Sequence, residues 1–151
     1  MILVHAEAAR SIKSAAENNM EVKVFKRDQY SEIVDIGVDL LTRMGFPDEE
    51  RDRKAILNSS RVGIVYDEGD PVGIGRVISD EAQISFIVDV NILKDKRRNG
   101  FGKALVVALA QSCDSKNIML TTDPRDEGLA DFYRKAGFKL SEGEHVFEWP
   151  H

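Results

Sequence analysis

The stretch that decides the fold runs from Ile92 to Cys113 and reads "ILKDKRRNGFGKALVVALAQSC". An apolar run precedes it, basic residues surround Gly100 and Gly102, and a long apolar segment without turn residues follows. In that last segment Leu105, Leu109 and Cys113 share one helical face. The pattern predicts a strand, a basic glycine-containing turn and a helix in direct succession.

The residues before this stretch predict two helices inside a set of antiparallel strands. Glu21–Phe25 alternates charged and apolar residues, as a half-buried strand does. Gln29–Phe46 has helical spacing of its apolar residues, and Asp48–Ser60 begins with acids and suits a short exposed helix. Arg61–Leu93 contains three apolar runs separated by turn residues, which predicts a meander of three antiparallel strands.

The residues after the stretch predict a strand, a helix and a final strand. Asn117–Thr122 has the composition of a strand, Asp126–Phe138 that of a helix capped by Gly137, and His145–Trp149 that of a last strand. The complete order predicts an α/β (α+β) fold with a mixed sheet and one parallel pair where the helix after the glycines crosses over. Residues 1–19 are expected to form a helical extension, and residues 20–151 a single domain.

Composition argues against several classes of protein. The chain has 151 residues with 26 acidic and 21 basic side chains, and no basic stripe with interleaved aromatic residues, so we expect no nucleic-acid partner. Cys113 is the only cysteine, and no metal-ligand spacing occurs, so we expect no disulfide, no metal and a cytoplasmic location. No segment has the length and hydropathy of a membrane span or a signal peptide, so no membrane partner is expected.

The glycine turn has the properties of an anion site. A helix N-terminus leaves backbone N–H groups unpaired and carries the positive end of the helix dipole. Glycines let the backbone approach a ligand closely, and the basic residues add charge. The turn lacks the Gly-Lys-Ser/Thr of a P-loop and the third glycine of a dinucleotide fingerprint. A pyrophosphate held by backbone amides is the interpretation that these residues favour, and a solvated turn without ligand is the alternative.

The segment from Val72 to Leu140 resembles the GNAT superfamily of acyl-CoA-dependent N-acyltransferases. The family turn (Arg/Gln)-x-x-Gly-x-(Gly/Ala) is matched by Arg97, Gly100 and Gly102. The family element Phe-Tyr-x-x-x-Gly-Phe is matched at its four fixed positions by Phe132, Tyr133, Gly137 and Phe138. Where the family often has Asn-x-x-Ala before the Phe-Tyr pair, this chain has Asp126 and Leu129. The resemblance implies a mostly antiparallel, splayed sheet of about six to seven strands with about four helices.

The resemblance also implies a coenzyme site and a proton donor. Acetyl-CoA is the implied co-substrate, with the pantetheine arm beside the backbone of Ile92 and Leu93. The pyrophosphate would lie against the turn formed by Arg97, Arg98, Asn99, Gly100, Phe101, Gly102 and Lys103. Tyr133 is the implied acid for the leaving thiolate, which is chemically reasonable for a phenol with a pKa of about 10. A core tyrosine on an amphipathic helix is the structural alternative.

A general base is harder to assign from the sequence. An amine acceptor is protonated at pH 7 and must lose a proton before it attacks. Asp89 interrupts an apolar strand expected to be buried, and a buried carboxylate is costly unless it is paired or used. Asp89 is therefore the candidate base, and a hydrogen bond to a neighbouring loop is the alternative role. Asp80, Glu81 and Asp123 are weaker candidates on expected loops.

The acceptor pocket is expected to be built mainly by the first two helices and their loop, from Tyr30 to Asn58, a strongly acidic region. Its carboxylates are Asp28, Glu32, Asp35, Asp39, Asp48, Glu49, Glu50 and Asp52. They favour a cationic acceptor, although such a charge run is usually a solvated helix face. We expect acetyl transfer to a small-molecule amine by direct attack in a ternary complex. The alternatives are a protein or peptide acceptor and a non-catalytic acyl-CoA sensor, and exposed sheet edges leave a homodimer open.

Overall fold

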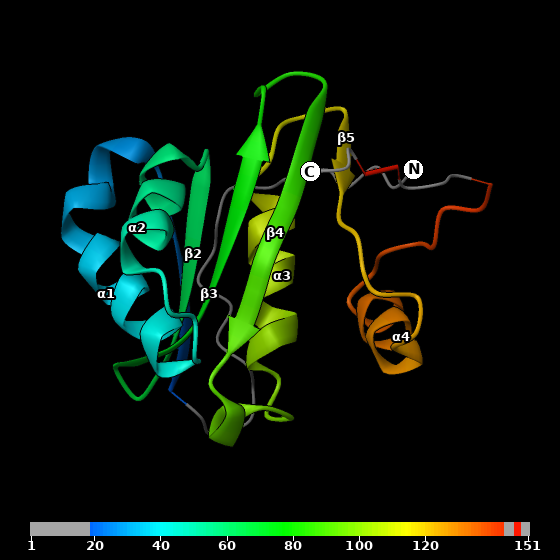
Figure 1. The fold of residues 1–151 in the computed structure, drawn as a ribbon. Helices are drawn as coiled ribbons and strands as arrows, with labels where there is room; N and C mark the ends of the chain where they lie inside the picture. Colours follow the sequence, from blue (N-terminus) through cyan, green and yellow to red (C-terminus); the bar gives the residue numbers. More distant parts are fainter. Residues whose placement is uncertain (1–18, 144–146, 149–151) are drawn as a thin grey trace.

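The computed structural model describes residues 19–143 and 147–148. Five strands form one sheet in the order β1-β2-β3-β4-β5 (Figure 1). The strands are β1 Met20–Phe25, β2 Arg61–Asp67, β3 Asp70–Ser79, β4 Ile84–Ile92 and β5 Asn117–Met119. The helices are α1 Tyr30–Arg43, α2 Glu49–Asn58, α3 Phe101–Gln111 and α4 Glu127–Lys135, with 3-10 turns η1 Arg27–Gln29 and η2 Lys94–Lys96.

The sheet is antiparallel from β1 to β4, and β5 joins it in parallel after the α3 crossover. The parallel pairing is short, because only Ile84–Phe86 of β4 faces Asn117–Met119 of β5. Beyond Phe86 the two strands separate, and the chain leaves β5 for α4 (Figure 1). The second half of β4 therefore has a strand neighbour on one side only within the described residues.

A bulge bends β4 where this open edge begins. Ile74 of β3 faces Asn91, and Arg76 faces Val88, so Asp89 and Val90 together oppose the single residue between them on β3. Asp89 adopts a left-handed conformation with φ 53°. A bulge of this kind re-aims the bulged side chain and strengthens the local twist. The strand alternation seen in the sequence is therefore interrupted at Asp89.

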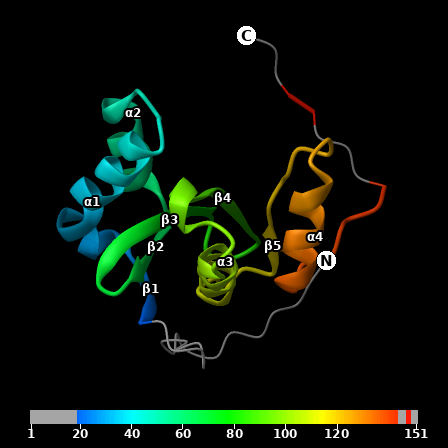
Figure 2. The ribbon, with the colours of Figure 1, turned by 90° about the horizontal axis from the view of Figure 1, so that it is seen from below.

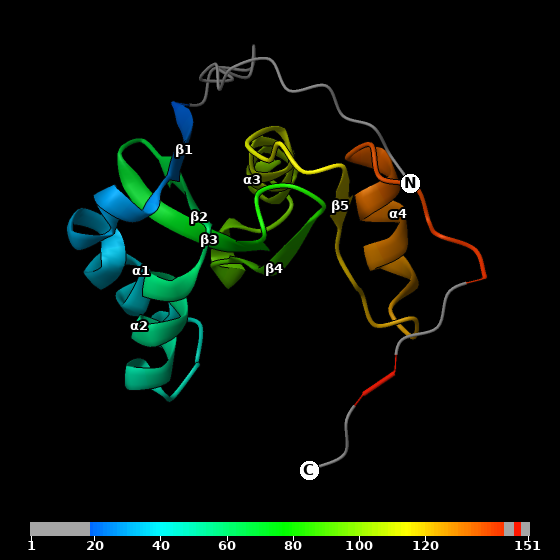
Figure 3. The same ribbon diagram turned by 90° about the horizontal axis from the view of Figure 1, so that it is seen from above.

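Helices cover both faces of the sheet. α1 and α2 lie on one face and α3 on the other, while α4 lies beside β5 at the far end (Figures 2 and 3). Val62, Ile64 and Val65 of β2 are fully buried, as expected for a strand covered on both sides. A Cβ atom on Gly63 would lie 2.8 Å from Leu105 Cδ1, so α3 packs directly on the β2 backbone. This close packing fixes the N-terminus of α3 relative to the end of β4.

The structure corrects the predicted strand count. The described residues form five strands instead of six to seven. Of the predicted strand His145–Trp149, only Phe147 and Glu148 are described, and neither belongs to a strand. The predicted strand from Asn117 ends at Met119, before Leu120–Thr122. The predicted N-terminal helix lies outside the described residues. In the part of the chain that is described, no helix is both long and apolar enough to cross a membrane.

Candidate active site

The glycine turn presents the free end of α3. Gly100 is the residue before the first helical turn and has φ 84°, and Arg98 is also left-handed with φ 65°. No side chain caps α3, and residues 97–100 are exposed. The first backbone N–H groups of α3 are therefore available to an external acceptor, at the positive end of the helix dipole. The geometry agrees with an anion site at Gly100–Lys103.

Two side chains hold the turn in shape. Arg97 Nε donates a hydrogen bond of 3.2 Å to the carbonyl of Ile92, which ties the turn to the end of β4. Asn99 Nδ2 donates to the carbonyls of Lys96 and Arg97, both at 3.2 Å. Arg97 and Asn99 therefore have structural partners within the loop, so their predicted coenzyme contacts would come in addition to these bonds.

The other basic residues divide into one that is paired and three that are free. Lys96 Nζ lies 2.8 Å from Asp67 Oδ2, and this hydrogen bond raises the pKa of Lys96. The side chains of Lys94, Arg98 and Lys103 are exposed and have no partner among the described residues. Arg98 and Lys103 flank the free end of α3 in sequence, so they are the basic side chains best placed to meet a phosphate there.

Gly102 lies where the glycine turn packs against Phe132 of α4. A Cβ atom at Gly102 would lie 3.2 Å from Phe132 Cζ and 3.6 Å from Ile92 Cγ1, so the phenyl ring rests against the α3 backbone. Phe101 beside it is buried and belongs to the core. The second glycine of the motif is thus explained by the packing of two helices, whereas Gly100 is explained by its left-handed backbone.

The end of β4 offers one backbone edge. The N–H of Leu93 donates to the carbonyl of Val72 at 2.9 Å, so Leu93 is hydrogen-bonded to β3. Successive backbone groups of a strand point to opposite sides, so those of Ile92 face the open edge. The Ile92 carbonyl accepts from Arg97 Nε, which leaves its N–H for the pantetheine arm, and this contact stays a prediction. The N–H and the carbonyl of Leu93 have partners in Val72 and Lys96, and the pantetheine contact of Leu93 also stays a prediction.

Tyr133 lies on α4 next to Phe132. Its ring makes edge-on contacts with Phe132, with centroids 5.0 Å apart, and with Phe138, with centroids 5.9 Å apart. Burial raises the pKa of Tyr133, and its hydroxyl has no hydrogen-bond partner among the described residues. The phenol therefore stays protonated at neutral pH and has a proton to donate, which suits the acid role predicted for it.

Asp89 differs from the sequence expectation. Its side chain is 57% exposed instead of buried, because the bulge turns it out of the strand alternation. It forms an ion pair with Arg76, whose Nε and Nη2 both donate to Asp89 Oδ2. Arg76 also donates to Ser59 Oγ at 3.0 Å, so it connects the bulge to the C-terminal end of α2. Asp89 thus has a partner on β3, a different one from the loop considered as an alternative.

Asp52, which the sequence places only in the acidic run of the expected acceptor pocket, belongs to the same region as Asp89. Its Oδ2 is inaccessible to solvent and has no hydrogen-bond partner among the described residues. Burial raises the pKa of Asp52, the nearby carboxylates of Asp48 and Asp89 raise it further, and Arg76 lowers it. The sequence feature that could have identified Asp52 is its position four residues before Ile56, the buried residue of α2. We refer to Asp52, Arg76 and Asp89 as the bulge cluster.

The weaker base candidates have structural roles. Asp80 Oδ1 accepts the backbone N–H groups of the turn that follows it, and these bonds lower the pKa of Asp80. Glu81 forms a double hydrogen bond with Arg61. Arg125 donates to both oxygens of Asp123 and lowers its pKa. Asp126, at the position where the family often has Asn, caps α4 through the N–H of Leu129 at 3.2 Å.

Comparison with solved structures supports the fold. The chain superposes on the GNAT family acetyltransferase SP0256 from Streptococcus pneumoniae TIGR4 with a TM-score of 0.70 and 21% identity, over 87% of this chain and 98% of that one. It is also similar to the aminoglycoside acetyltransferase meta-AAC0020 from an uncultured soil metagenomic sample, solved in complex with sisomicin. There the TM-score is 0.66 and the identity 19%, over 87% and 96% of the two chains.

Sequence comparison adds a relative and a family. The chain is 32% identical over 85 residues to the uncharacterized protein YyaT of Bacillus subtilis (strain 168), and the match spans 55% of each protein. The family model for the Acetyltransferase (GNAT) family matches residues 26–138, which include the glycine turn, the bulge cluster and the Phe-Tyr element. With most of the described sheet and all four helices inside that match, this chain belongs to the GNAT acetyltransferase family.

Proposed function

We propose that this protein transfers the acetyl group of acetyl-CoA to the primary amine of a small cationic molecule. The observation that carries the proposal is the placement of two unlike sites at the second half of β4. The uncapped α3 end follows the strand and suits an anion, and the bulge cluster, with two carboxylates against the one guanidinium of Arg76, suits a cation. An acyl-CoA is anionic and a protonated amine is cationic, so the charges of the two substrates match those that the two sites suit.

On the coenzyme side, the residues fit the group they would hold. The N–H groups of Gly100–Lys103 and the free side chain of Arg98 would bind the pyrophosphate, and the open edge at Ile92 would bind the pantetheine amides. The coenzyme supplies a thioester, whose carbonyl carbon is the point of attack. Tyr133 would give its phenolic proton to the sulfur as the carbon–sulfur bond breaks.

On the acceptor side, Asp89 is the exposed carboxylate that would contact an ammonium group. Asp52 adds negative charge behind it, and its raised pKa makes it a better proton acceptor than an ordinary carboxylate. The amine nitrogen forms the new bond to the carbonyl carbon after it gives up one proton to this pair of carboxylates. As the carbon–sulfur bond breaks, the nitrogen loses a second proton to solvent, and Tyr133 regains from solvent the proton that it gave to the sulfur. An aminoglycoside acetyltransferase with this fold is a precedent for a small acceptor rich in amines.

The experiment is a panel assay that follows release of the coenzyme A thiol. Diamines, aminoglycosides, amino acids and short peptides are compared at equal ionic strength, with neutral sugars as the negative set. The proposal predicts turnover with small cationic amines, and a KM that rises in Asp89→Asn but not in Asp39→Asn. Asp39 is a suitable control because it is an exposed α1 carboxylate paired with Arg43.

Three other results have distinct meanings. Turnover with peptides alone would point to a protein or peptide acceptor. Acetyl-CoA binding by calorimetry without turnover on any amine would favour the acyl-CoA sensor. No acetyl-CoA binding at millimolar ligand would reject the enzyme and the sensor together.

A further inference from the structure

One face of β3 and β4 carries apolar side chains beside the bulge cluster. Ile78 of β3 is the cross-strand partner of Phe86 on β4, and Arg76 is the partner of Val88. Cross-strand partners point to the same face of a sheet, and so do residues two apart on one strand. The face of Arg76 therefore also carries four apolar side chains, which we call the apolar strip: Ile78, Ile84, Phe86 and Val88.

The apolar strip is open to solvent, although the other face of the same strands is buried. Ile78 is 54% exposed and Ile84 36%, whereas Val77 and Ser85, on the face that α3 covers, are fully buried. The other two members of the strip are partly exposed. In Figure 1 α3 lies behind β4, and no described helix lies in front of it. Exposed apolar side chains that form a contiguous patch indicate a binding surface, whereas single ones do not.

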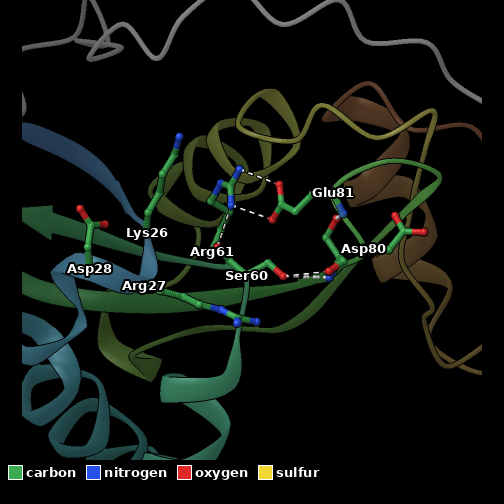
Figure 4. Close-up of a pocket in the computed structure, with 8 residues that line it drawn as sticks. Lys26, Arg27, Asp28, Ser60, Arg61, Asp80 and Glu81 are labelled. Carbon is green, nitrogen blue, oxygen red and sulfur yellow. Dashed lines mark hydrogen bonds and ion pairs between the residues drawn. The ribbon is translucent and has the colours of Figure 1, made fainter.

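The turn between β3 and β4 holds one end of the apolar strip in a fixed shape. Asp80 Oδ1 accepts three backbone N–H groups of the turn at 2.8 to 3.0 Å. Glu81 accepts two hydrogen bonds from Arg61 of β2, at 2.9 and 3.0 Å, which tie the turn to the sheet (Figure 4). Ile78 and Ile84 flank this turn, so their backbone is ordered before a ligand binds, which lowers the entropy cost of binding.

The bulge cluster at the other end of the strip suits one ammonium group. Asp89 follows Val88 directly, and Nε and Nη2 of Arg76 both donate to Asp89 Oδ2. Asp89 Oδ1 accepts no hydrogen bond from the described residues, and the side chain is 57% exposed. Asp52 Oδ2 is inaccessible to solvent, so that atom adds charge without contacting a ligand. With two carboxylates against one guanidinium, a single ammonium group completes the charge balance.

We propose that the acceptor of the transfer reaction is a primary monoamine with an apolar body. Its ammonium group would meet Asp89 Oδ1, and its hydrocarbon would lie over Val88 and Phe86 toward Ile78. Three residues of β4 separate Asp89 from Phe86, or about 10 Å of strand, which leaves room for a chain of about six carbon atoms. This inference rests on the proposed acetyl transfer and narrows the class of its acceptor.

The test compares matched primary amines in the assay that follows release of the coenzyme A thiol. Hexylamine and phenethylamine have apolar bodies, propylamine has a shorter one, and 1,6-diaminohexane adds a second ammonium group at the far end of the hexyl chain. The kcat/KM of hexylamine should exceed those of propylamine and 1,6-diaminohexane by about tenfold each, because only hexylamine can bury the whole chain on the strip without burying a charge. Phenethylamine should resemble hexylamine.

The possible results separate this inference from the proposed function. If propylamine or 1,6-diaminohexane is turned over as efficiently as hexylamine, the apolar acceptor is rejected and the acetyl transfer stands. If no amine is turned over, both are rejected.

Two substitutions make the apolar strip more polar with little change in its shape. Val88→Thr is nearly isosteric, and Ile78→Thr keeps a β-branched side chain suited to a strand. The double variant should lower the ratio of kcat/KM for hexylamine to that for propylamine by about fivefold. Leu140→Thr is the control, because Leu140 is 62% exposed and lies after α4, and it should keep the wild-type ratio. Equal ratios in the wild type and the double variant would contradict the proposal.

Two further measurements complete the test. Ile78→Thr alone changes an exposed position, so it should still lower the ratio if the double variant fails to fold. Analytical ultracentrifugation tests a second copy of this chain as the occupant of the apolar strip. A wild-type dimer that becomes monomeric in Ile78→Thr would assign the strip to that copy and overturn the proposal.

Discussion

Gly100→Asp and Gly100→Asn together separate anion binding from backbone strain. Gly100 has φ 84°, and a Cβ atom there would meet only Met20 Cε at 3.9 Å, an ordinary van der Waals distance. Asp and Asn have almost the same shape, and both tolerate the left-handed region better than other side chains do. Any difference between the two variants therefore reports the added charge.

Compared with Gly100→Asn, Gly100→Asp should be more stable against unfolding but should bind acetyl-CoA more weakly. A carboxylate next to the free N–H groups of α3 stabilises the helix, so the Asp variant should exceed the Asn variant by about 0.3–1 kcal/mol in unfolding free energy. The same carboxylate repels a phosphate bound at these groups. Two unit charges about 4 Å apart at an effective dielectric of about 20 interact by about 4 kcal/mol. Solvent exposure of the turn reduces this to about 1–3 kcal/mol, or a loss of about 5- to 150-fold in acetyl-CoA affinity.

Urea unfolding gives the stability, and calorimetric titration with acetyl-CoA gives the dissociation constant. The matched control is Gly69→Asp with Gly69→Asn in the β2–β3 turn, where φ is 88° and nothing lies within 4 Å of a Cβ atom. That pair should bind acetyl-CoA equally. Equal acetyl-CoA dissociation constants for Gly100→Asp and Gly100→Asn would refute the assignment of the turn as the phosphate site.

Three further predictions concern residues near the proposed reaction. Gly102→Leu should lower the unfolding free energy in urea by about 1–3 kcal/mol, because even its Cβ atom would lie 3.2 Å from Phe132 Cζ; unchanged stability would contradict this packing. Tyr133→Phe should lower kcat by about 100-fold with an unchanged acetyl-CoA dissociation constant, and since burial raises the pKa of Tyr133, the wild-type rate should show no loss from its ionisation below about pH 10. Asp52→Asn should raise the unfolding free energy at pH 7, because the raised pKa of Asp52 means that the folded state favours the protonated carboxyl and loses stability when the carboxyl ionises as pH rises. The gain in unfolding free energy, measured in urea, should vanish below about pH 4, and a loss of stability at pH 7 would reject the reasoning.

The elements set by local pattern were predicted well from the sequence. The first strand, α1, the meander and α3 were found within a few residues, because apolar periodicity and turn residues act over short distances. Gly100 was identified as part of a motif, and the structure adds its left-handed backbone. The reason for Gly102 was not predictable, since Phe132, its packing partner, is thirty positions away and arrives with α4.

The acceptor side was predicted less well, because its geometry depends on strand register. Strand alternation predicts a buried Asp89, but one extra residue opposite β3 turns its side chain outward. The partner, Arg76, lies on a different strand, and Asp52 looked like one more acid in an exposed run. The ion pair of Arg61 with Glu81 gave no sequence signal either, since the two residues meet only when β2 lies beside the β3–β4 turn.

The contact between Gly102 and Phe132 also bears on product release. α4 contains no buried residue and most of its side chains are exposed, so this helix should open more readily than the sheet. An opening of α4 would move Tyr133, which contacts Phe132, away from Gly102, and closing would bring it back. A tighter contact would raise the population of closed enzyme and the affinity for acetyl-CoA, but it would also lengthen the residence time of the coenzyme A product. In the proposed reaction, the fit between Gly102 and the Phe132 ring would thus set a balance between coenzyme affinity and turnover.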